Sequence, residues 1–206
     1  MARDMGSIVK MSRREGYALH PKAHKALVKR SSMPGQKPGY MSRNKPSQYA
    51  LQLREKQKVK RLYGLLERQF RRLMTEASQS RGQSGQVLLQ FLELRLDNVV
   101  YRAGFAASRR ASRQLTTHGH FMLNGRRVDV PSIRVKQGDE IVVREHSKAT
   151  EYFKRLDEVS PASPNDLPAW LKVNRKKLEI SVSGIPTRED AEPDINEQLI
   201  VEYYSR

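Results

Sequence analysis

Cysteine is absent from this sequence of 206 residues, which excludes disulfide bonds and thiolate metal sites. Long apolar runs are also absent, because no stretch approaches the roughly 18 apolar residues that a membrane-spanning helix needs. No signal-peptide pattern precedes the basic start, so we expect no membrane partner. Hydrophobic residues make up 37% of the chain and aromatic residues 7%, which predicts small cores in one large domain or two small ones.

Acidic residues are scarce, with 22 Asp and Glu against 39 Lys and Arg and a formal net charge of +17. The excess is uneven, since the first 80 residues carry 19 basic and 5 acidic side chains and the last 46 carry 6 and 8. A charge of this size exceeds what solubility needs and indicates a polyanionic partner. The uneven distribution favours one face on nucleic acid and another toward protein over a uniformly basic membrane-surface or nucleoid protein.

Catalytic and metal-binding patterns are missing as well. The sequence shows no Gly-rich phosphate loop, metal-ligand cluster or paired carboxylates in a core pattern. His20 and His24 lie four residues apart but lack further ligands to complete a zinc site. Asp97 is interpreted as a structural carboxylate that pairs with a nearby arginine, and His118 and His120 lack a nucleophile. We therefore expect no enzymatic activity, no cofactor and no metal.

Residues 1–46 are rich in Gly and Pro and show little periodicity apart from a possible short helix near His24 to Arg30. Such a segment buries too little apolar area to offset its ordering entropy. We expect it to be extended or mobile when free and to order on its partner, the alternative being a tail with no contact role.

From Ser47 the pattern becomes helical, with an apolar stripe that continues to about Ser78 and a bend or break near Gly64. The opposite face is basic, and like charges four residues apart, such as Lys56 and Lys60, destabilise an isolated helix. A bound phosphate backbone would reverse that effect, whereas the alternative reading is an ordinary solvated face. A polar linker over residues 78–86 follows.

The most informative stretch spans residues 94–130, LRLDNVVYRAGFAASRRASRQLTTHGHFMLNGRRVDV. Helical spacing from Leu92 to Ala103 ends at Gly104, and Ser108 is placed to cap a helix over about Arg109 to His118. Asn124-Gly125 is a strong hairpin signal. Arginines in the first turns of that helix and directly after the hairpin turn predict a basic groove suited to RNA, against the alternative of a solvated basic face.

Beyond the hairpin, we expect strands at 133–135, 141–143 and 178–182, with the first two paired. A helix capped by Ser147 would end at Pro161, and a last element from Asp194 is compatible with a helix or a strand.

Several phrases resemble a known family. RLDNVVYR, RQLTTHGH and NGRRV resemble the small αL-type RNA-binding module of ribosomal protein four of the small subunit, which also occurs in some pseudouridine synthases and tyrosyl-tRNA synthetases. MSRREG, LQLREKQKVKRLYGLLERQFRR, PAWLKVN and DINEQLIVEYYSR extend the resemblance to nearly the whole of the bacterial family. Ala111 departs from it, because relatives often carry a glutamate there, and Val9 stands where zinc-binding relatives have their first cysteine.

The resemblance implies an α+β fold, with a mostly helical basic N-terminal domain and a small αL-type RNA-binding module containing a short β-sheet. The expected segments are an extended basic segment (1–46), a helical N-terminal domain (47–86), the RNA-binding module (87–160), and a loop-rich C-terminal segment that packs back and contacts protein partners (161–206).

The function implied by the resemblance is that of a structural protein of the small ribosomal subunit in the cytoplasm. Its partners would be 16S ribosomal RNA, bound at a multi-helix junction in the 5′ domain to nucleate assembly, and small-subunit ribosomal protein five. It would lie near the channel through which messenger RNA enters, with Arg43 and Lys45 facing the messenger, and would affect translational accuracy without forming a homo-oligomer. The alternatives are an RNA-modifying enzyme that carries the same module and a general nucleic-acid binder that acts off the ribosome.

The predicted RNA-binding residues are basic or polar side chains: Arg3, Lys10, Arg13, Arg14, Arg43, Lys45, Arg54, Lys56, Lys58, Lys60, Arg61, Arg68, Arg71, Arg72, Arg109, Arg110, Arg113, Gln114, His118, Asn124, Arg126 and Arg127. Of these, Arg109, Arg113, Arg126 and Arg127 are each expected to reach a phosphate, so that each alanine substitution would flatten the salt dependence of binding.

Overall fold

The computed structural model describes residues 4–35, 46–161 and 167–205. It has the α+β architecture that the sequence predicts and divides into two compact units. The first unit comprises the chain up to Leu88 together with the chain from Pro193 onward, and the second unit comprises Leu89–Glu192. The stretch after residue 160 is therefore shared between the two units.

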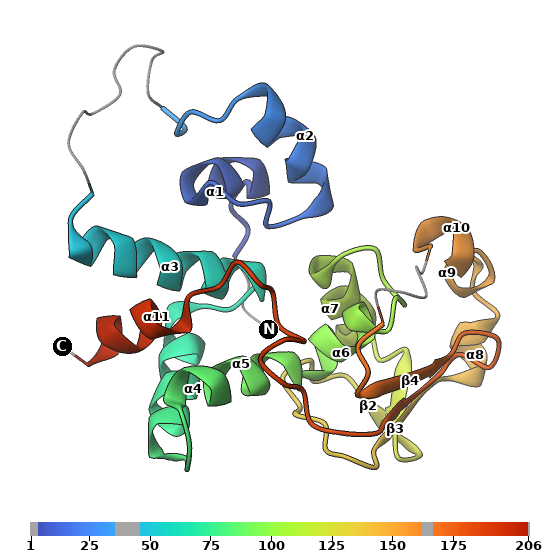
Figure 1. The fold of residues 1–206 in the computed structure, drawn as a ribbon. Coiled ribbons are helices and arrows are strands. Elements are labelled where there is room, and N and C mark those ends of the chain that lie inside the picture. Colours follow the sequence, from blue (N-terminus) through green and yellow to red (C-terminus); the bar gives the residue numbers. More distant parts are fainter. Residues whose placement is uncertain (1–3, 36–45, 162–166, 206) are drawn as a thin grey trace. The chain divides into compact units, whose positions relative to one another are not determined.

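The first unit is built from helices (Figure 1). They are α1 (Ile8–Glu15), α2 (Pro21–Lys29), α3 (Gln48–Leu62), α4 (Glu67–Gln79), the first half of α5 (Ser84–Glu93) and α11 (Glu197–Tyr204). Both α1 and α11 pack against α3, which is therefore central to the unit. Val59 of α3, Phe70 of α4 and Ile200 of α11 are each completely buried.

Helix α3 begins and ends where the sequence predicts. The Ser47 hydroxyl accepts a hydrogen bond from the Ala50 N–H at 3.3 Å, which satisfies one free amide of the first turn. At the other end, Gly64 adopts a φ of 66°, a left-handed conformation that is cheap only for glycine and that turns the chain toward α4. The predicted break at Gly64 is therefore confirmed.

The prediction of an extended segment over residues 1–46 is wrong for its described part, which contains α1 and α2. The possible short helix near His24 to Arg30 is confirmed as part of α2. Polar contacts hold this part where apolar periodicity is weak. The buried Ser12 hydroxyl donates to Ile8 O at 2.8 Å and accepts from the Leu19 N–H at 3.3 Å. The Arg13 guanidinium donates to Ser32 O at 2.9 Å and so ties the loop after α2 to α1.

Gly85 in the first turn of α5 lies directly against α11. A Cβ added there would stand 2.8 Å from Cγ and 2.9 Å from Cβ of Glu197. We therefore expect Gly85→Ala to lower the free energy of unfolding of the first unit by about 1–3 kcal/mol, the usual cost of overpacking. Chemical denaturation checks this result. The matched control is Gly184→Ala in the second unit, where the added Cβ would meet only Trp170 Cβ at an ordinary 3.7 Å; equal losses would contradict the prediction.

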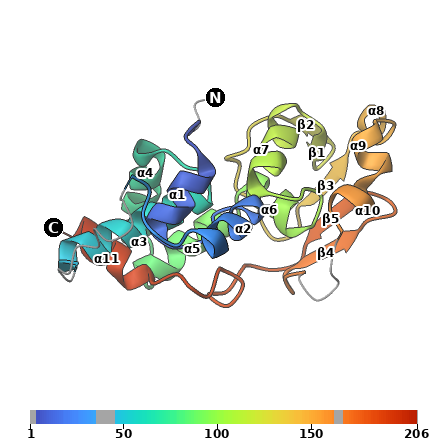
Figure 2. The same ribbon diagram turned by 90° about the horizontal axis from the view of Figure 1, so that it is seen from above.

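The second unit joins a five-stranded antiparallel sheet to helices. Its strands are β1 (Phe121–Leu123), β2 (Arg126–Val128), β3 (Glu140–Val143), β4 (Leu171–Asn174) and β5 (Glu179–Val182), in the spatial order β2-β1-β3-β5-β4. Its helices are the second half of α5, α6 (Leu96–Arg102), α7 (Arg109–Thr117), α8 (Glu145–Lys148), α9 (Glu151–Lys154) and α10 (Leu156–Val159). Figure 2 shows α8, α9 and α10 gathered on one side of this unit and α7 on the other.

The core of the second unit lies between the sheet and its helices. Phe121 of β1 and Ile180 of β5 are completely buried, and so is Phe105 in the loop between α6 and α7. Phe153 of α9 packs edge-on against Phe121 with ring centroids 6.2 Å apart. The hairpin and the last two strands thus share one core with α9.

The hairpin of β1 and β2 confirms the Asn124-Gly125 prediction. Asn124 and Gly125 have φ values of 49° and 76°, as a two-residue turn with both central residues left-handed requires. The Asn124 side chain is fixed as well, because it donates to Asp139 Oδ1 at 2.8 Å and accepts from the Glu140 N–H at 2.9 Å.

Residues 133–135 do not form the predicted strand. The Val135 N–H donates to Leu94 O at 2.9 Å, and the Leu96 N–H donates to Ile133 O at 2.8 Å. These bonds tie the segment to the junction between α5 and α6, where the predicted continuous helix from Leu92 to Ala103 is interrupted. As a result, β3 pairs with β1 and β5.

The helix predicted after Ser147 consists instead of the three short helices α8, α9 and α10. Ser147 lies inside α8 rather than capping it, and its hydroxyl is 3.0 Å from Nδ1 of His120. Thr150 and Arg155, at the boundaries between these helices, leave helical geometry and interrupt the run.

The last element, for which the sequence allowed either a helix or a strand, is the helix α11. Its cap is Asn196 rather than Asp194. The Asn196 side-chain oxygen accepts from the N–H groups of Gln198 and Leu199 at 3.2 and 3.4 Å.

Candidate nucleic-acid interface

Helix α7 presents two different polar faces. The Ser108 hydroxyl accepts from the Ala111 N–H at 3.2 Å, which confirms the predicted cap. Ser112 and Thr116 are buried, whereas Arg110, Gln114 and His118 are exposed. Arg109 and Arg113 lie closer to the buried face, with side chains only 13% and 12% exposed.

Arg113 binds a buried carboxylate. Asp97 accepts from Nε and Nη2 of Arg95 at 3.0 and 2.8 Å and from Nη1 of Arg113 at 3.1 Å. The Asp97 carbonyl also accepts from the Ser112 hydroxyl. Both residues of the Arg95–Asp97 pair are almost completely buried, so the interpretation of Asp97 as a structural carboxylate is confirmed.

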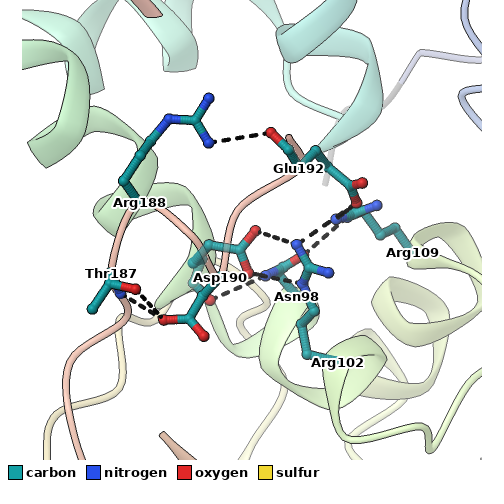
Figure 3. A network of polar contacts seen from close by, with 8 residues as sticks. Asn98, Arg102, Arg109, Thr187, Arg188, Asp190 and Glu192 are labelled. Carbon is teal, nitrogen blue, oxygen red and sulfur yellow. Dashed lines mark hydrogen bonds and ion pairs between the residues drawn. The ribbon is translucent and has the colours of Figure 1, made fainter. Parts of the chain in front are cut away.

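Arg109 belongs to a second network, drawn in Figure 3. Its Nη2 donates to Glu192 Oε1 at 2.9 Å, and its Nε donates to Asn98 Oδ1 at 2.9 Å. Asn98 in turn donates to Glu93 Oε2 at 2.7 Å, and Arg102 forms a bidentate pair with Glu93 at 2.8 and 3.0 Å. The arginines that face inward from α6 and α7 therefore already contact carboxylates.

The basic groups of the hairpin differ from Arg109 and Arg113 in their exposure and pairing. Arg126 and Arg127 are exposed, and the structure shows no ion pair to either from residues 4–35, 46–161 or 167–205. Arg127 passes so close to Gly119 that a Cβ there would lie 2.8 Å from its Nε. Arg144, which the sequence reasoning missed, donates to Gly119 O at 3.2 Å, so two guanidinium groups converge on one turn.

This turn has a positive electrostatic environment. Burial, together with the neighbouring charges of His118 and Arg144, lowers the pKa of His120. The lowered pKa favours the uncharged form of His120, so the positive charge at this turn comes from Arg127 and Arg144.

The basic side chains of α3 pair with carboxylates of the first unit. Lys56 and Lys60 pair with Glu67 at 2.7 and 3.1 Å, and Lys58 pairs with Glu55 at 2.8 Å. The remaining two, Arg54 and Arg61, bind Glu15 at the end of α1. Five of the residues predicted to contact RNA thus hold the unit together.

The pKa values of Glu67 and Glu15 are shifted in opposite directions. Burial alone would raise the pKa of Glu67, but hydrogen bonds from Lys56, Lys60 and Tyr204 outweigh it and hold that pKa below its ordinary value. Glu15 is completely buried, and this burial raises its pKa despite the nearby charges of Arg54 and Arg61.

Helix α4 carries three exposed arginines. Arg68, Arg71 and Arg72 are exposed, and no ion pair to them occurs within the described part of the chain. Lys10 and Arg14 of α1 are exposed as well, whereas Arg13 is held by Ser32. Arg3, Arg43 and Lys45 lie outside the described residues.

The two histidines that lie four residues apart do not form a metal site with further ligands in the part of the chain that the structure describes. His20 accepts the Lys22 N–H at its Nδ1 at 3.1 Å and so caps α2. Among residues whose placement is described, no three His, Cys, Asp or Glu side chains gather as a metal site would require. Within the same residues, no helix combines the length and apolar character needed to cross a membrane.

Comparison with known proteins places this architecture in a family. The family model "Ribosomal protein S4/S9 N-terminal domain" matches residues 3–93, and the model "S4 domain" matches residues 94–141. A protein of Chloroflexus aurantiacus named "Small ribosomal subunit protein uS4" is 50% identical over 206 residues, which cover 100% of both chains. Proteins of the same name from Roseiflexus castenholzii and Clostridioides difficile are 49% and 50% identical, again over 100% of each chain. The resemblance read from the sequence is confirmed, and the chain belongs to the uS4 family of small ribosomal subunit proteins.

Proposed function

We propose that this protein is a structural component of the small ribosomal subunit in the cytoplasm, with no enzymatic role, and that it binds 16S ribosomal RNA. Family membership supports the assignment to the subunit. The observation that carries the RNA-binding role is the division of the basic residues into two classes: those of α3 pair with carboxylates, whereas those of α4 and the hairpin are exposed.

The exposed arginines suit the RNA backbone. Guanidinium groups bind phosphate oxygens in a bidentate manner, and each phosphate that is neutralised releases counterions. Arg126 and Arg127 project from a hairpin whose turn is fixed by Asn124, so their positions are set before binding. Contacts of this kind favour RNA shape and backbone geometry over base sequence.

The proposal extends to the RNA target, the protein partner and the messenger. The RNA target would be a multi-helix junction in the 5′ domain, bound early so that it nucleates assembly. Residues 87–160 would form the RNA-binding module, and the near-neutral residues 161–206 would contact small-subunit ribosomal protein five and so influence accuracy. The exposed side chain of Ile185 supports a protein contact in that part of the chain. Arg43 and Lys45 would face messenger RNA near the channel through which it enters.

Salt dependence tests the RNA-binding surface. We expect Arg126→Ala and Arg127→Ala each to weaken binding to a 16S 5′-domain transcript and to reduce the slope of log affinity against log salt by roughly 0.7–0.9, one phosphate's worth. Filter binding over a series of salt concentrations measures both quantities. Lys172→Ala, an exposed lysine on the edge strand β4 at the other end of the sheet, is the matched control. Slopes unchanged in both arginine variants would show that the hairpin does not contact RNA.

A further inference from the structure

The carboxylate of Glu192 is placed against an arginine that the sequence assigns to RNA. Its Oε1 lies 2.9 Å from Nη2 of Arg109 and 3.6 Å from Nη2 of Arg102. Arg102 already has a bidentate partner in Glu93, so the main effect of Glu192 falls on Arg109. Glu192 comes from a segment 83 residues further along the chain, and no local constraint of α7 supplies it.

The segment that brings Glu192 to α7 is itself held in place. The Asp190 carboxylate accepts from the backbone N–H and the hydroxyl of Thr187 at 2.7 and 2.9 Å, which closes a tight turn. Arg188 donates to the Glu192 carbonyl at 3.3 Å. Figure 3 shows these contacts on one side of Glu192 and Arg109 on the other, with the carboxylate directed at the guanidinium group.

The pair is not sealed off from solvent. The side chains of Arg109 and Glu192 are 13% and 21% exposed. Carboxylate and phosphate offer the same acceptor geometry to a guanidinium group, so one can replace the other without moving the arginine far. Nε of Arg109 donates to Asn98 Oδ1, whereas Nη2 donates to Glu192, so exchange of the anion at Nη2 does not require the bond to Asn98 to break.

We propose that Glu192 is an internal competitor for RNA: it occupies Arg109 in the free protein and is displaced by a backbone phosphate when RNA binds. This inference rests on the proposed RNA-binding function and describes how that function is regulated at α7. In the free protein the contact at Arg109 is closed, whereas Arg126 and Arg127 are open to solvent. RNA therefore gains the α7 contact only by exchanging one anion for another.

The test compares Glu192→Gln with Glu189→Gln. Both changes remove one negative charge from the same segment, but Glu189 is exposed, whereas Glu192 forms the ion pair with Arg109. Glutamine keeps an oxygen that can accept from Arg109, and thermal unfolding of both variants checks that the fold is retained. We expect Glu192→Gln to bind a 16S 5′-domain transcript about two- to fivefold more tightly than Glu189→Gln. Because a phosphate contacts Arg109 in the bound state of both variants, their salt slopes should be equal.

A double-mutant cycle makes the test specific to Arg109. In an Arg109→Ala background, Glu192→Gln should bind no more tightly than Glu189→Gln. Equal affinities of the two glutamine variants in the original background, or weaker binding by Glu192→Gln, would overturn the inference and make Glu192 a positioning residue. The same gain in the Arg109→Ala background would overturn it as well. Absence of binding by the unmodified chain would overturn the proposed function and this inference together.

Discussion

Ending the chain at Glu192 is expected to unfold the first unit, although every residue removed lies at the far end of the sequence. Ile195 and Ile200 are buried in that unit, and each such side chain stabilises it by about 1.5–3 kcal/mol. Because domains are stable by only about 5–15 kcal/mol, the loss of these side chains with their polar contacts is enough to unfold the unit.

The polar contacts made by α11 reach both α3 and the start of α4. Tyr204 donates its hydroxyl hydrogen to Glu67 at 2.9 Å, and the ammonium of Lys56 lies 4.3 Å from the centre of the Tyr203 ring. Gln52 donates to Glu202 at 2.9 Å. Burial and the hydrogen bond to Glu67 raise the pKa of Tyr204, so its hydroxyl remains a donor throughout the neutral range.

Hydrogen exchange followed by mass spectrometry measures the outcome separately in the two units. Amides of α3 and α4 should lose protection in the shortened chain, while those of β1 and β3 keep it. A chain that ends at Tyr204 is the matched control, because it lacks only Ser205 and Arg206 and retains every buried side chain of α11. Protected α3 amides in the chain that ends at Glu192 would contradict the prediction.

Replacing Asp97 with asparagine is expected to lower the free energy of unfolding of the second unit by about 3–5 kcal/mol. The change keeps the shape of the side chain but removes the charge that Arg95 and Arg113 share. Arg95 is only 5% exposed, so its guanidinium charge would remain buried without a compensating carboxylate.

Urea denaturation of the full chain measures this loss, with Asp157→Asn as the matched control. Asp157 also pairs with an arginine, Arg175, at 2.9 Å, but its side chain is 91% exposed. Solvent screens such a pair, and its removal should change stability little. A loss for Asp97→Asn no greater than that for Asp157→Asn would show that burial does not make the Asp97 pair important.

Local signals in the sequence were sufficient at several positions where a few neighbouring residues determine the geometry, although Ser147 and Asp194 do not cap the helices predicted from them. Ser47 and Ser108 cap their helices through bonds to residues three positions ahead, and Asn124-Gly125 forms the predicted turn. Helix α1 had such a signal too, since Gly16 follows a basic last turn as helix-ending glycines do. The weak apolar pattern of residues 1–46 obscured it.

The errors arise where distant residues decide the outcome. Residues 133–135 alternate as a strand would, but their hydrogen-bond partners Leu94 and Leu96 lie almost forty positions earlier and belong to a helix junction. The site shows the same limitation. Basic residues could be selected from the sequence, but pairs such as Arg109 with Glu192 and Arg61 with Glu15 depend on tertiary structure. The sequence therefore identifies the basic residues, but the fold determines which of them pair with carboxylates and which are exposed to a ligand.

The first unit is assembled from the two ends of the chain, with the second unit inserted between Leu88 and Pro193. During translation, α3 emerges early but must wait for α11, whose codons are read after those of the whole second unit. The inserted unit has all of its strands available earlier and can complete its core first, which reverses the usual N-to-C order of domain folding. A premature stop codon between the second unit and α11 would therefore damage the part of the protein that was synthesised first.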